Sequence, residues 1–146
     1  MYERILICTD GSALSQTAER AGILLAAALD AEAVAYTVVP HQPHWNNETG
    51  KVMTHAEMTQ LENELSQAAQ SIVDSVQEQG HRRDVKTIAV TGRGAVAESI
   101  LHAAKKYHCD LIVMASHGRK GIKRLLLGSE TMDVLTHSHI PVLVLR

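Results

Sequence analysis

Residues 3–12 read ERILICTDGS, and this stretch indicates how the rest of the chain folds. Residues 5–8 are apolar without interruption, which is typical of a short strand buried on both faces of a sheet. The Thr-Asp-Gly-Ser that follows supplies turn residues and a serine able to begin a helix. Leu and Ala then recur at helical spacing over residues 12–29, and AVAYTVV at 33–39 is strand-like again. The opening of the chain therefore predicts a β-α-β unit.

The same alternation continues to the end of the chain. The further predicted elements are a loop at 40–50, helices over about 51–79, 95–107 and 129–138, and strands over 85–90, 110–116 and 141–146. In the helix over 51–79, which Gly80 is expected to end, one apolar stripe is expected to face the core: Met58, Leu61, Leu65, Ala68, Ile72, Val73 and Val76. Apolar strands alternating with helices indicate a parallel sheet covered on both faces. We expect one α/β domain over residues 1–146, a doubly wound five-stranded sheet of order 3-2-1-4-5.

Composition excludes some partners and leaves others open. The formal charge of −2 and the pI near 6.5 provide no basic field for a nucleic acid or an anionic membrane surface. No apolar run reaches the length of a membrane span, and residues 1–8 do not resemble a signal peptide, so a soluble cytoplasmic protein is expected. Cys8 and Cys109 are expected to be reduced and buried. The nine histidines lack the spacing of a metal site, so no metal ligands are predicted among them.

The positions of two loops predict where a ligand binds. In such sheets ligands lie beyond the carboxyl ends of the strands, where the strand order reverses. The loop at 9–12 and the loop running from Ala115 to Ser129 should face each other there. Gly118 permits close approach, and Gly128-Ser129 precedes a helix whose free N–H groups favour an anion. Four cations lie between the two glycines, and they favour phosphate as that anion: Arg119, Lys120, Lys123 and Arg124.

Three segments carry a resemblance to a known family over the whole chain: ILICTDGS, DLIVMASHGRKGIKRLLLGS and PVLVL. They resemble the universal stress protein family, whose ATP-binding branch is marked by G-x2-G-x9-G-[ST]. Here the pattern reads Ala115, Gly118, Gly128 and Ser129, so its last three marked positions match and its first is Ala. The resemblance implies an adenine nucleotide alpha-hydrolase-like fold and an ATP-binding module.

Carried across residue by residue, the resemblance implies a set of nucleotide contacts. Asp10 and the backbone near Thr9 would meet the adenosine, and Val38 and Val39 would line the adenine pocket. The remaining implied contacts flank the ribose or hold the phosphates: Met114, Ala115, Gly118, Gly128, Ser129 and the backbone of Glu130 and Thr131. Apart from the resemblance, His117 and Arg119 are candidate donors to a phosphate oxygen because they lie within the same loop. A carboxylate at 130 repels a phosphate chain, so this assignment requires the Glu130 side chain to turn away.

The leading hypothesis for function is a regulatory or stress-response module that binds ATP with Mg²⁺, with ADP and AMP as alternative nucleotides. Occupancy would change the surfaces at 40–50 and 117–127, which a regulatory protein partner reads. The strand at 141–145 would otherwise be an exposed apolar edge, and both this edge and the resemblance imply a homodimer through it.

Two alternatives of another class stay open. One is a slow ATPase or phosphotransferase, with Asp10 positioning Mg²⁺ and Ser129 as phosphoacceptor, although the chain has no P-loop, nucleophile elbow or paired catalytic carboxylates. The other is an interaction protein that needs no nucleotide. A dinucleotide fingerprint is also present as G-x-G-x-x-A over 92–97, but it lies outside the first β-α turn and Asp110 precedes a strand instead of ending one.

Overall fold

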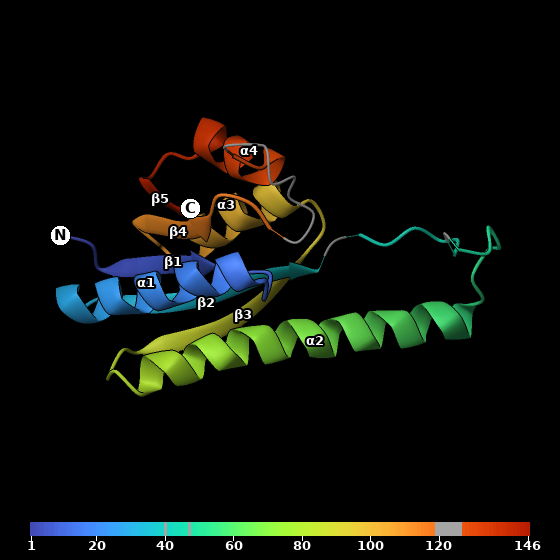
Figure 1. The fold of residues 1–146 in the computed structure, drawn as a ribbon, viewed down its shortest axis with the longest axis horizontal. Coiled ribbons are helices and arrows are strands. Elements are labelled where there is room, and N and C mark those ends of the chain that lie inside the picture. The colour runs from blue at the N-terminus through green and yellow to red at the C-terminus, as the bar shows by residue number, and fades with distance from the viewer. Residues whose placement is uncertain (40, 47, 119–126) are drawn as a thin grey trace.

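The computed structural model describes residues 1–39, 41–46, 48–118 and 127–146. Within these ranges, strands and helices alternate along the chain (Figure 1). The elements are β1 (Arg4–Cys8), α1 (Ala13–Leu29), β2 (Glu32–Val39), α2 (His55–His81), β3 (Thr87–Arg93), α3 (Val96–Lys106), β4 (Leu111–Ala115), α4 (Ser129–His137) and β5 (Val142–Leu145). None of the described helices combines the length and the apolar character needed to cross a bilayer.

The five strands form one sheet in the order β3-β2-β1-β4-β5, and every ladder is parallel. This confirms the predicted topology. β1 is central, so that Ile7 pairs with Ala35 on one side and Val113 on the other. The carboxyl ends of β2, β1 and β4 therefore meet at one edge, and we refer to this edge as the switch-point edge.

Two hydrophobic cores lie on opposite faces of the sheet. One core joins α1 and α2 to alternate residues of the central strands, among them Ile5, Ile7 and Val113. The other core joins α3 and α4 to the residues in between, among them Leu6 and Ile112. All five of these residues are 0% exposed. Because alternate side chains of a strand point to opposite faces, strands covered on both sides must be apolar throughout.

The boundaries of α2 differ from those predicted. The helix begins at His55 and not near 51, because the Thr54 hydroxyl accepts from the Glu57 amide and Glu57 accepts from the Thr54 amide, a capping box. Gly80 does not end the helix but lies inside it. A Cβ at Gly80 would lie 2.9 Å from Cβ of Thr87, so glycine is what lets α2 pack closely on β3.

Only the second half of α2 is a core helix. Its buried residues are Ala69, Val73, Val76 and Gly80. Figure 1 shows the start of α2 and the preceding segment projecting beyond the strands. Met58, Leu61 and Leu65 are accordingly only half-buried, and Ala68, also predicted in the core, is exposed. β3 continues to Arg93 and not to 90, because the eight-residue β2 pairs with it up to Val39.

At the opposite edge of the sheet, the Glu32 carboxylate joins neighbouring strands. Glu32, at the start of β2, forms ion pairs with Arg4 of β1 and with Lys86 just before β3. Arg4 also donates to the Tyr107 carbonyl at 3.0 Å. The hydrogen bonds from Lys86 and Arg4 lower the pKa of the Glu32 carboxyl. One acidic side chain thus ties together the first residues of three neighbouring strands.

Replacing Glu32 with Gln is expected to lower the free energy of unfolding at pH 7 by up to about 1 kcal/mol, the scale of partly exposed ion pairs. Because folding lowers the pKa of Glu32, its contribution is present above the unfolded pKa of about 4.3 and is lost as the pH falls through the folded pKa. Urea unfolding of both proteins at pH 7 and at pH 3 measures this difference. The exposed Glu62 on α2, replaced by Gln, is the control; a gap of equal size at both pH values would contradict the prediction.

Candidate functional site

The loop after β1 is held by hydrogen bonds from its own side chains. The Thr9 amide donates to the Tyr36 carbonyl at 3.0 Å, and the Gly11 amide donates to the Thr9 hydroxyl at 3.0 Å. Oδ1 of Asp10 accepts from the Ser12 amide at 2.9 Å and from the Ser15 hydroxyl at 2.7 Å. Gly11 has a φ of 78°, a conformation that favours glycine. The turn is therefore rigid, and Asp10 supports the start of α1.

The other carboxylate oxygen of Asp10 faces the loop after β4. A Cβ at Gly118 would overlap with Oδ2 of Asp10 and lie 3.3 Å from its Cγ. The two loops that the sequence predicted to face each other are thus in contact, through Asp10 and Gly118. Only a residue without a side chain permits this approach.

The start of α4 is joined directly to the end of β4. The Gly128 amide donates to the Ser116 carbonyl at 2.6 Å. The Thr131 hydroxyl donates to the Ala115 and Ser116 carbonyls at 3.0 and 3.1 Å, and Thr131 is 2% exposed. A Cβ at Gly128 would lie 3.3 Å from the Ser116 carbonyl oxygen. The first turn of α4 is therefore fixed against the switch-point edge.

The Glu130 side chain is directed from the start of α4 to the start of α3. Its Oε2 accepts from the Ala97 amide, in the first turn of α3, at 3.1 Å. A carboxylate at this position both satisfies a free N–H group and complements the positive end of the α3 dipole. The carboxylate of Glu130 is therefore hydrogen-bonded to the neighbouring helix α3.

Four further candidate residues lie at the ends of two strands, β2 and β4. Val38 and Val39 end β2, where Val39 is 7% exposed. Met114 and Ala115 end β4, and each is 6% exposed. Ala115 belongs to the core that covers the α1 side of the sheet, so the methyl group that distinguishes it from glycine packs into that core.

His117 and the cations of the loop complete the candidate list. Nδ1 of His117 lies 3.2 Å from the Ser116 hydroxyl, and the side chain is half-buried. Arg119, together with Lys120, Lys123 and Arg124, lies outside the described residues. Ser129 and Glu130 are exposed at the start of α4.

The family model of the universal stress protein family matches residues 1–146, the whole chain. The chain belongs to the universal stress protein family. A relative in Methanocaldococcus jannaschii, universal stress protein MJ0531, is 32% identical over 146 residues, which is 100% of this chain and 83% of that protein.

Solved structures of universal stress proteins share the fold. The structure of MJ0577, also from Methanocaldococcus jannaschii, is 26% identical, with a TM-score of 0.81 over 99% of this chain and 96% of that one. A universal stress protein in complex with cAMP is 22% identical, with a TM-score of 0.71 over 99% of this chain and 97% of that one. At this identity the second likeness shows the fold alone.

The dinucleotide-like G-x-G-x-x-A sequence has a packing role in this universal stress protein. Gly92 lies within β3 and not in a loop, and a Cβ there would lie 2.6 Å from the Ser99 hydroxyl. That hydroxyl is bonded to the Tyr36 hydroxyl at 2.7 Å. Glycine at 92 therefore makes room for a Tyr-Ser contact between β2 and α3.

Cysteine and histidine contribute no reactive cluster in the part of the chain that the structure describes. Cys8 and Cys109 are free and buried, as predicted. Burial raises the pKa of both thiols, that of Cys109 to about 11, so both are protonated near neutral pH. His41 and His44 lie edge to face with centroids 6.3 Å apart. Within the described residues, no three His, Cys, Asp or Glu side chains gather in a way that could hold a metal ion.

Sequence reasoning missed three residues that support the site, two through their side chains and one through its backbone carbonyl. Ser15 bonds Asp10, Ser116 carries the carbonyl that anchors α4, and Glu19 accepts from the Thr9 hydroxyl at 2.5 Å. Ser15 lies five residues after Asp10 near the first turn of a helix, and this spacing was the one available signal. The contacts of Ser116 and Glu19 follow from tertiary packing.

Replacing Thr131 with Val should lower the free energy of unfolding by about 1–2 kcal/mol, because a buried hydroxyl and the carbonyls it satisfies lose their hydrogen bonds. Thr131→Ser keeps the hydroxyl and should retain most of the difference, losing only a methyl group. Urea unfolding of the three proteins compares them. Equal stability of Thr131→Val and wild type would show that the hydroxyl does not anchor α4.

Proposed function

We propose that the chain binds an adenine nucleotide, ATP with Mg²⁺ foremost, at the switch-point edge between β1 and β4. The observation that carries the proposal is the start of α4. Gly128 is its N-cap and provides no side-chain cap, so the first amides of the helix have no acceptor from the capping residue.

The other helix starts at this edge do have side-chain acceptors. The α1 start is capped by Ser12, which accepts from the Ser15 amide at 3.3 Å. The α3 start receives Glu130 at the Ala97 amide. A phosphate group bound at α4 would accept from the amides of residues 129–131 and would meet the positive end of the helix dipole.

The two glycines support a phosphate groove beside that helix. Gly118 is exposed, and neither it nor Gly128 has a side chain to fill the space above the β4 end. In the proposed arrangement, the phosphate chain lies along the backbone of Gly118, Gly128 and Ser129. Arg119 and His117 are proposed donors to its oxygens.

The adenosine is proposed to lie towards β1 and β2. Asp10 would accept hydrogen bonds from ribose hydroxyls, beside the Thr9 backbone. Val38 and Val39 would contact the adenine base. Met114 and Ala115 would flank the ribose and phosphates from the β4 side. A universal stress protein of the same fold in complex with cAMP supports testing cyclic as well as linear nucleotides.

We propose that the chain binds the nucleotide and signals its presence to a partner, and that it does not act mainly as an enzyme on that nucleotide. Ser129, the phosphoacceptor of the enzyme alternative, is exposed, and the described carboxylate beside it, Glu130, is bonded to α3. Mg²⁺ would be held mainly by the phosphates, as is usual for this ion. The regulatory partner is proposed to read the surface before α2, where Trp45 and Val52 are 54% and 80% exposed.

Isothermal titration with Mg-ATP, Mg-ADP, AMP and cAMP tests the nucleotide proposal. Gly128→Val should weaken Mg-ATP binding at least about tenfold, about 1.4 kcal/mol, because a Cβ at 128 would lie 3.3 Å from His117 and from the Ser116 carbonyl and would displace the loop that is proposed to hold the phosphates. Gly128 has a φ of −72°, which valine adopts, and circular dichroism with urea unfolding checks that the variant is folded.

Ala95→Val is the matched control, because Ala95 is the N-cap of α3, is exposed and has a similar φ of −67°. It should bind like the wild type. Absence of binding by the wild-type protein, shown to be folded and free of carried-over nucleotide, would favour the interaction-protein alternative.

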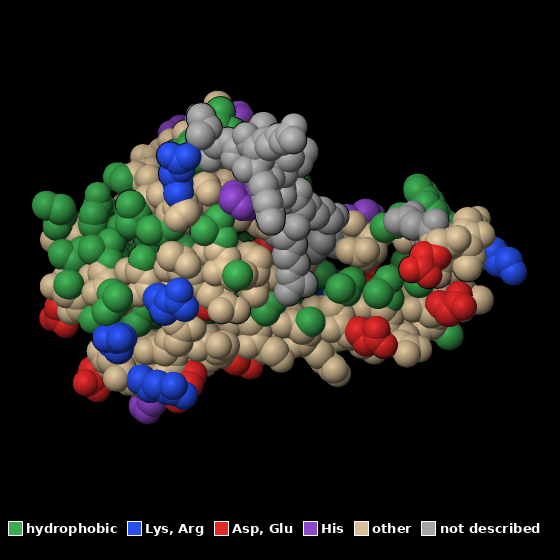
Figure 2. Space-filling model, viewed as in Figure 1, with side chains coloured by type: hydrophobic (Ala, Val, Ile, Leu, Met, Phe, Trp, Pro, Cys, Tyr) green, Lys and Arg blue, Asp and Glu red, His purple; other side chains and the backbone are tan. Residues whose placement is uncertain are grey.

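We also propose a homodimer through β5. β5 and β3 are the two edges of the sheet, and Leu143 of β5 is 40% exposed. Met132 and Leu135 of the neighbouring α4 are 48% and 39% exposed. Figure 2 shows hydrophobic side chains gathered on the left of the molecule, over α1 and β5. A second copy paired along β5 would cover this edge.

Leu143→Glu should convert the dimer to a monomer at micromolar concentration, because a charge would be buried in the strand pairing. Ile88→Glu is the control, since Ile88 lies on the other edge strand and is also 40% exposed. Light scattering after gel filtration gives both masses. A wild-type monomer, or a dimer lost only in Ile88→Glu, would refute the β5 interface.

The proposed location is the cytoplasm. Cys8 and Cys109 are free thiols, which suits a reducing compartment.

A further inference from the structure

Glu19 is a buried carboxylate in the middle of α1, and it is 4% exposed. Its two oxygens have separate partners: Oε1 accepts from the Thr9 hydroxyl at 2.5 Å, and Oε2 accepts from the Gln79 amide at 3.1 Å. No ion pair to Glu19 occurs among the residues that the structure describes. A buried charge held only by neutral donors is costly, so its presence calls for a role other than stability.

The first partner connects Glu19 to the loop after β1. A threonine hydroxyl has one proton, and Thr9 donates it to Glu19. The lone pairs of the same oxygen are thereby directed at the Gly11 amide, 3.0 Å away. Glu19 thus determines how the hydroxyl is oriented, and the hydroxyl determines the turn that carries Asp10 towards Gly118.

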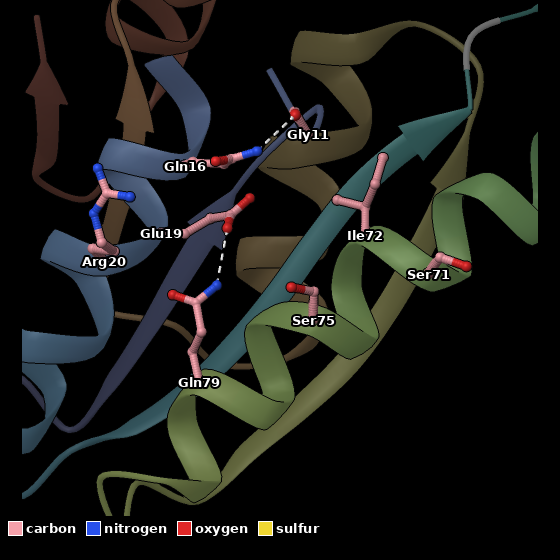
Figure 3. Close-up of a pocket in the computed structure, with 8 residues that line it drawn as sticks. All are labelled: Gly11, Gln16, Glu19, Arg20, Ser71, Ile72, Ser75 and Gln79. Carbon is pink, nitrogen blue, oxygen red and sulfur yellow. Dashed lines mark hydrogen bonds between the residues drawn. The ribbon is translucent and has the colours of Figure 1, made fainter. Parts of the chain in front are cut away.

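The second partner connects Glu19 to α2. Figure 3 shows Glu19 of α1 and Gln79 of α2 pointing towards each other across the gap between the two helices. This gap is a polar cavity of about 470 Å³ that Gly11 and Ser75 also line. The neighbouring Gln77 fixes the same end of α2 to β3, by donating to the Thr87 carbonyl at 2.8 Å. Gln79 therefore presents a well-placed donor to Glu19.

We propose that Glu19 is a positioning residue for the nucleotide loop, through which the placement of α2 sets the geometry of residues 9–12. The proposal rests on the nucleotide binding proposed above. Gln79, Glu19, Thr9 and Gly11 form one continuous chain of hydrogen bonds from α2 to that loop. A displacement of α2 would reach the loop through this chain. The start of α2 is the part of the helix that projects beyond the sheet (Figure 1), where a partner would contact it.

Three variants separate positioning from folding. Glu19→Leu removes both hydrogen bonds and leaves the buried Thr9 hydroxyl without its acceptor, so urea unfolding is measured beside binding to show that the variant is folded. Its affinity for Mg-ATP should fall about tenfold, the equivalent of one lost hydrogen bond in the loop. Glu19→Gln keeps an acceptor for Thr9 and should bind within about threefold of the wild type. The exposed Glu62→Gln on α2 controls for loss of an acidic charge.

Thr9→Val and the double variant with Glu19→Leu test the pathway. If both residues act through one hydrogen bond, the double variant binds no more weakly than the weaker single variant. Wild-type affinity in Glu19→Leu, or an equal loss in Glu19→Gln, would overturn the positioning role. Additive losses in the double variant would overturn it as well.

Hydrogen exchange of the Gly11 amide, measured in the ligand-free protein, tests the role of Glu19 in the loop without depending on nucleotide binding. Glu19→Leu should raise this exchange about tenfold, and Glu19→Gln should restore protection. If the wild-type chain binds no nucleotide, the nucleotide proposal fails. In that case faster Gly11 exchange in Glu19→Leu would still support the link from α2 to the loop, and unchanged exchange would overturn it.

Discussion

β1 pairs in parallel with both β2 and β4, and the other features of the molecule depend on this double pairing. A central strand covered by helices on both faces must be apolar on both faces, as Ile5, Leu6 and Ile7 are. Parallel pairing also brings the carboxyl ends of three strands to one edge, with the loops that follow them. The place where a ligand can meet several backbone loops is thus a consequence of the sheet itself.

The carboxylates near the sheet have different partners at its two edges: cations at one edge and the starts of helices at the other. Glu32 joins cations from two neighbouring segments at the amino edge of the sheet. At the switch-point edge Asp10 accepts from the α1 start, and Glu130 accepts from the α3 start. Most of the negative charge near the proposed nucleotide is therefore already bonded to helix amides. The α4 start is the one of these three for which the described side chains provide no cap, which is why an anion is proposed there.

Glu19 connects the switch-point edge to α2, a helix whose position is not set by the pairing of the strands. α2 packs on β3 through its second half, with Val73 and Val76 fully buried, whereas its first half projects beyond the strands. Such a helix has a fixed end and an end available to a partner. The bond from Gln79 to Glu19 lies towards the fixed end, and the bond from Thr9 to Glu19 continues the chain to the β1 loop. The surface proposed for a partner and the loop proposed for the nucleotide are in this way joined by a short chain of hydrogen bonds.

The sequence by itself determined the order of elements, the strand order and the two loops that meet. Periodicity is a local property, and apolar runs such as residues 5–8 and 111–115 have few alternatives to a buried parallel strand. Prediction was weaker for α2, where Gly80 was expected to end the helix and Ala68 to be buried. The helix runs one residue past Gly80, to His81, and Gly80 lies where α2 packs closely on Thr87 of β3. Ala68 is exposed because it faces away from the sheet, whereas its neighbour Ala69 is buried. The tertiary structure alone decided these points, and with them the orientation of Glu130 towards α3 and the bonds of Glu19. The partners of Glu130 and Glu19 lie at least ten residues away along the chain, and no local pattern encodes their positions.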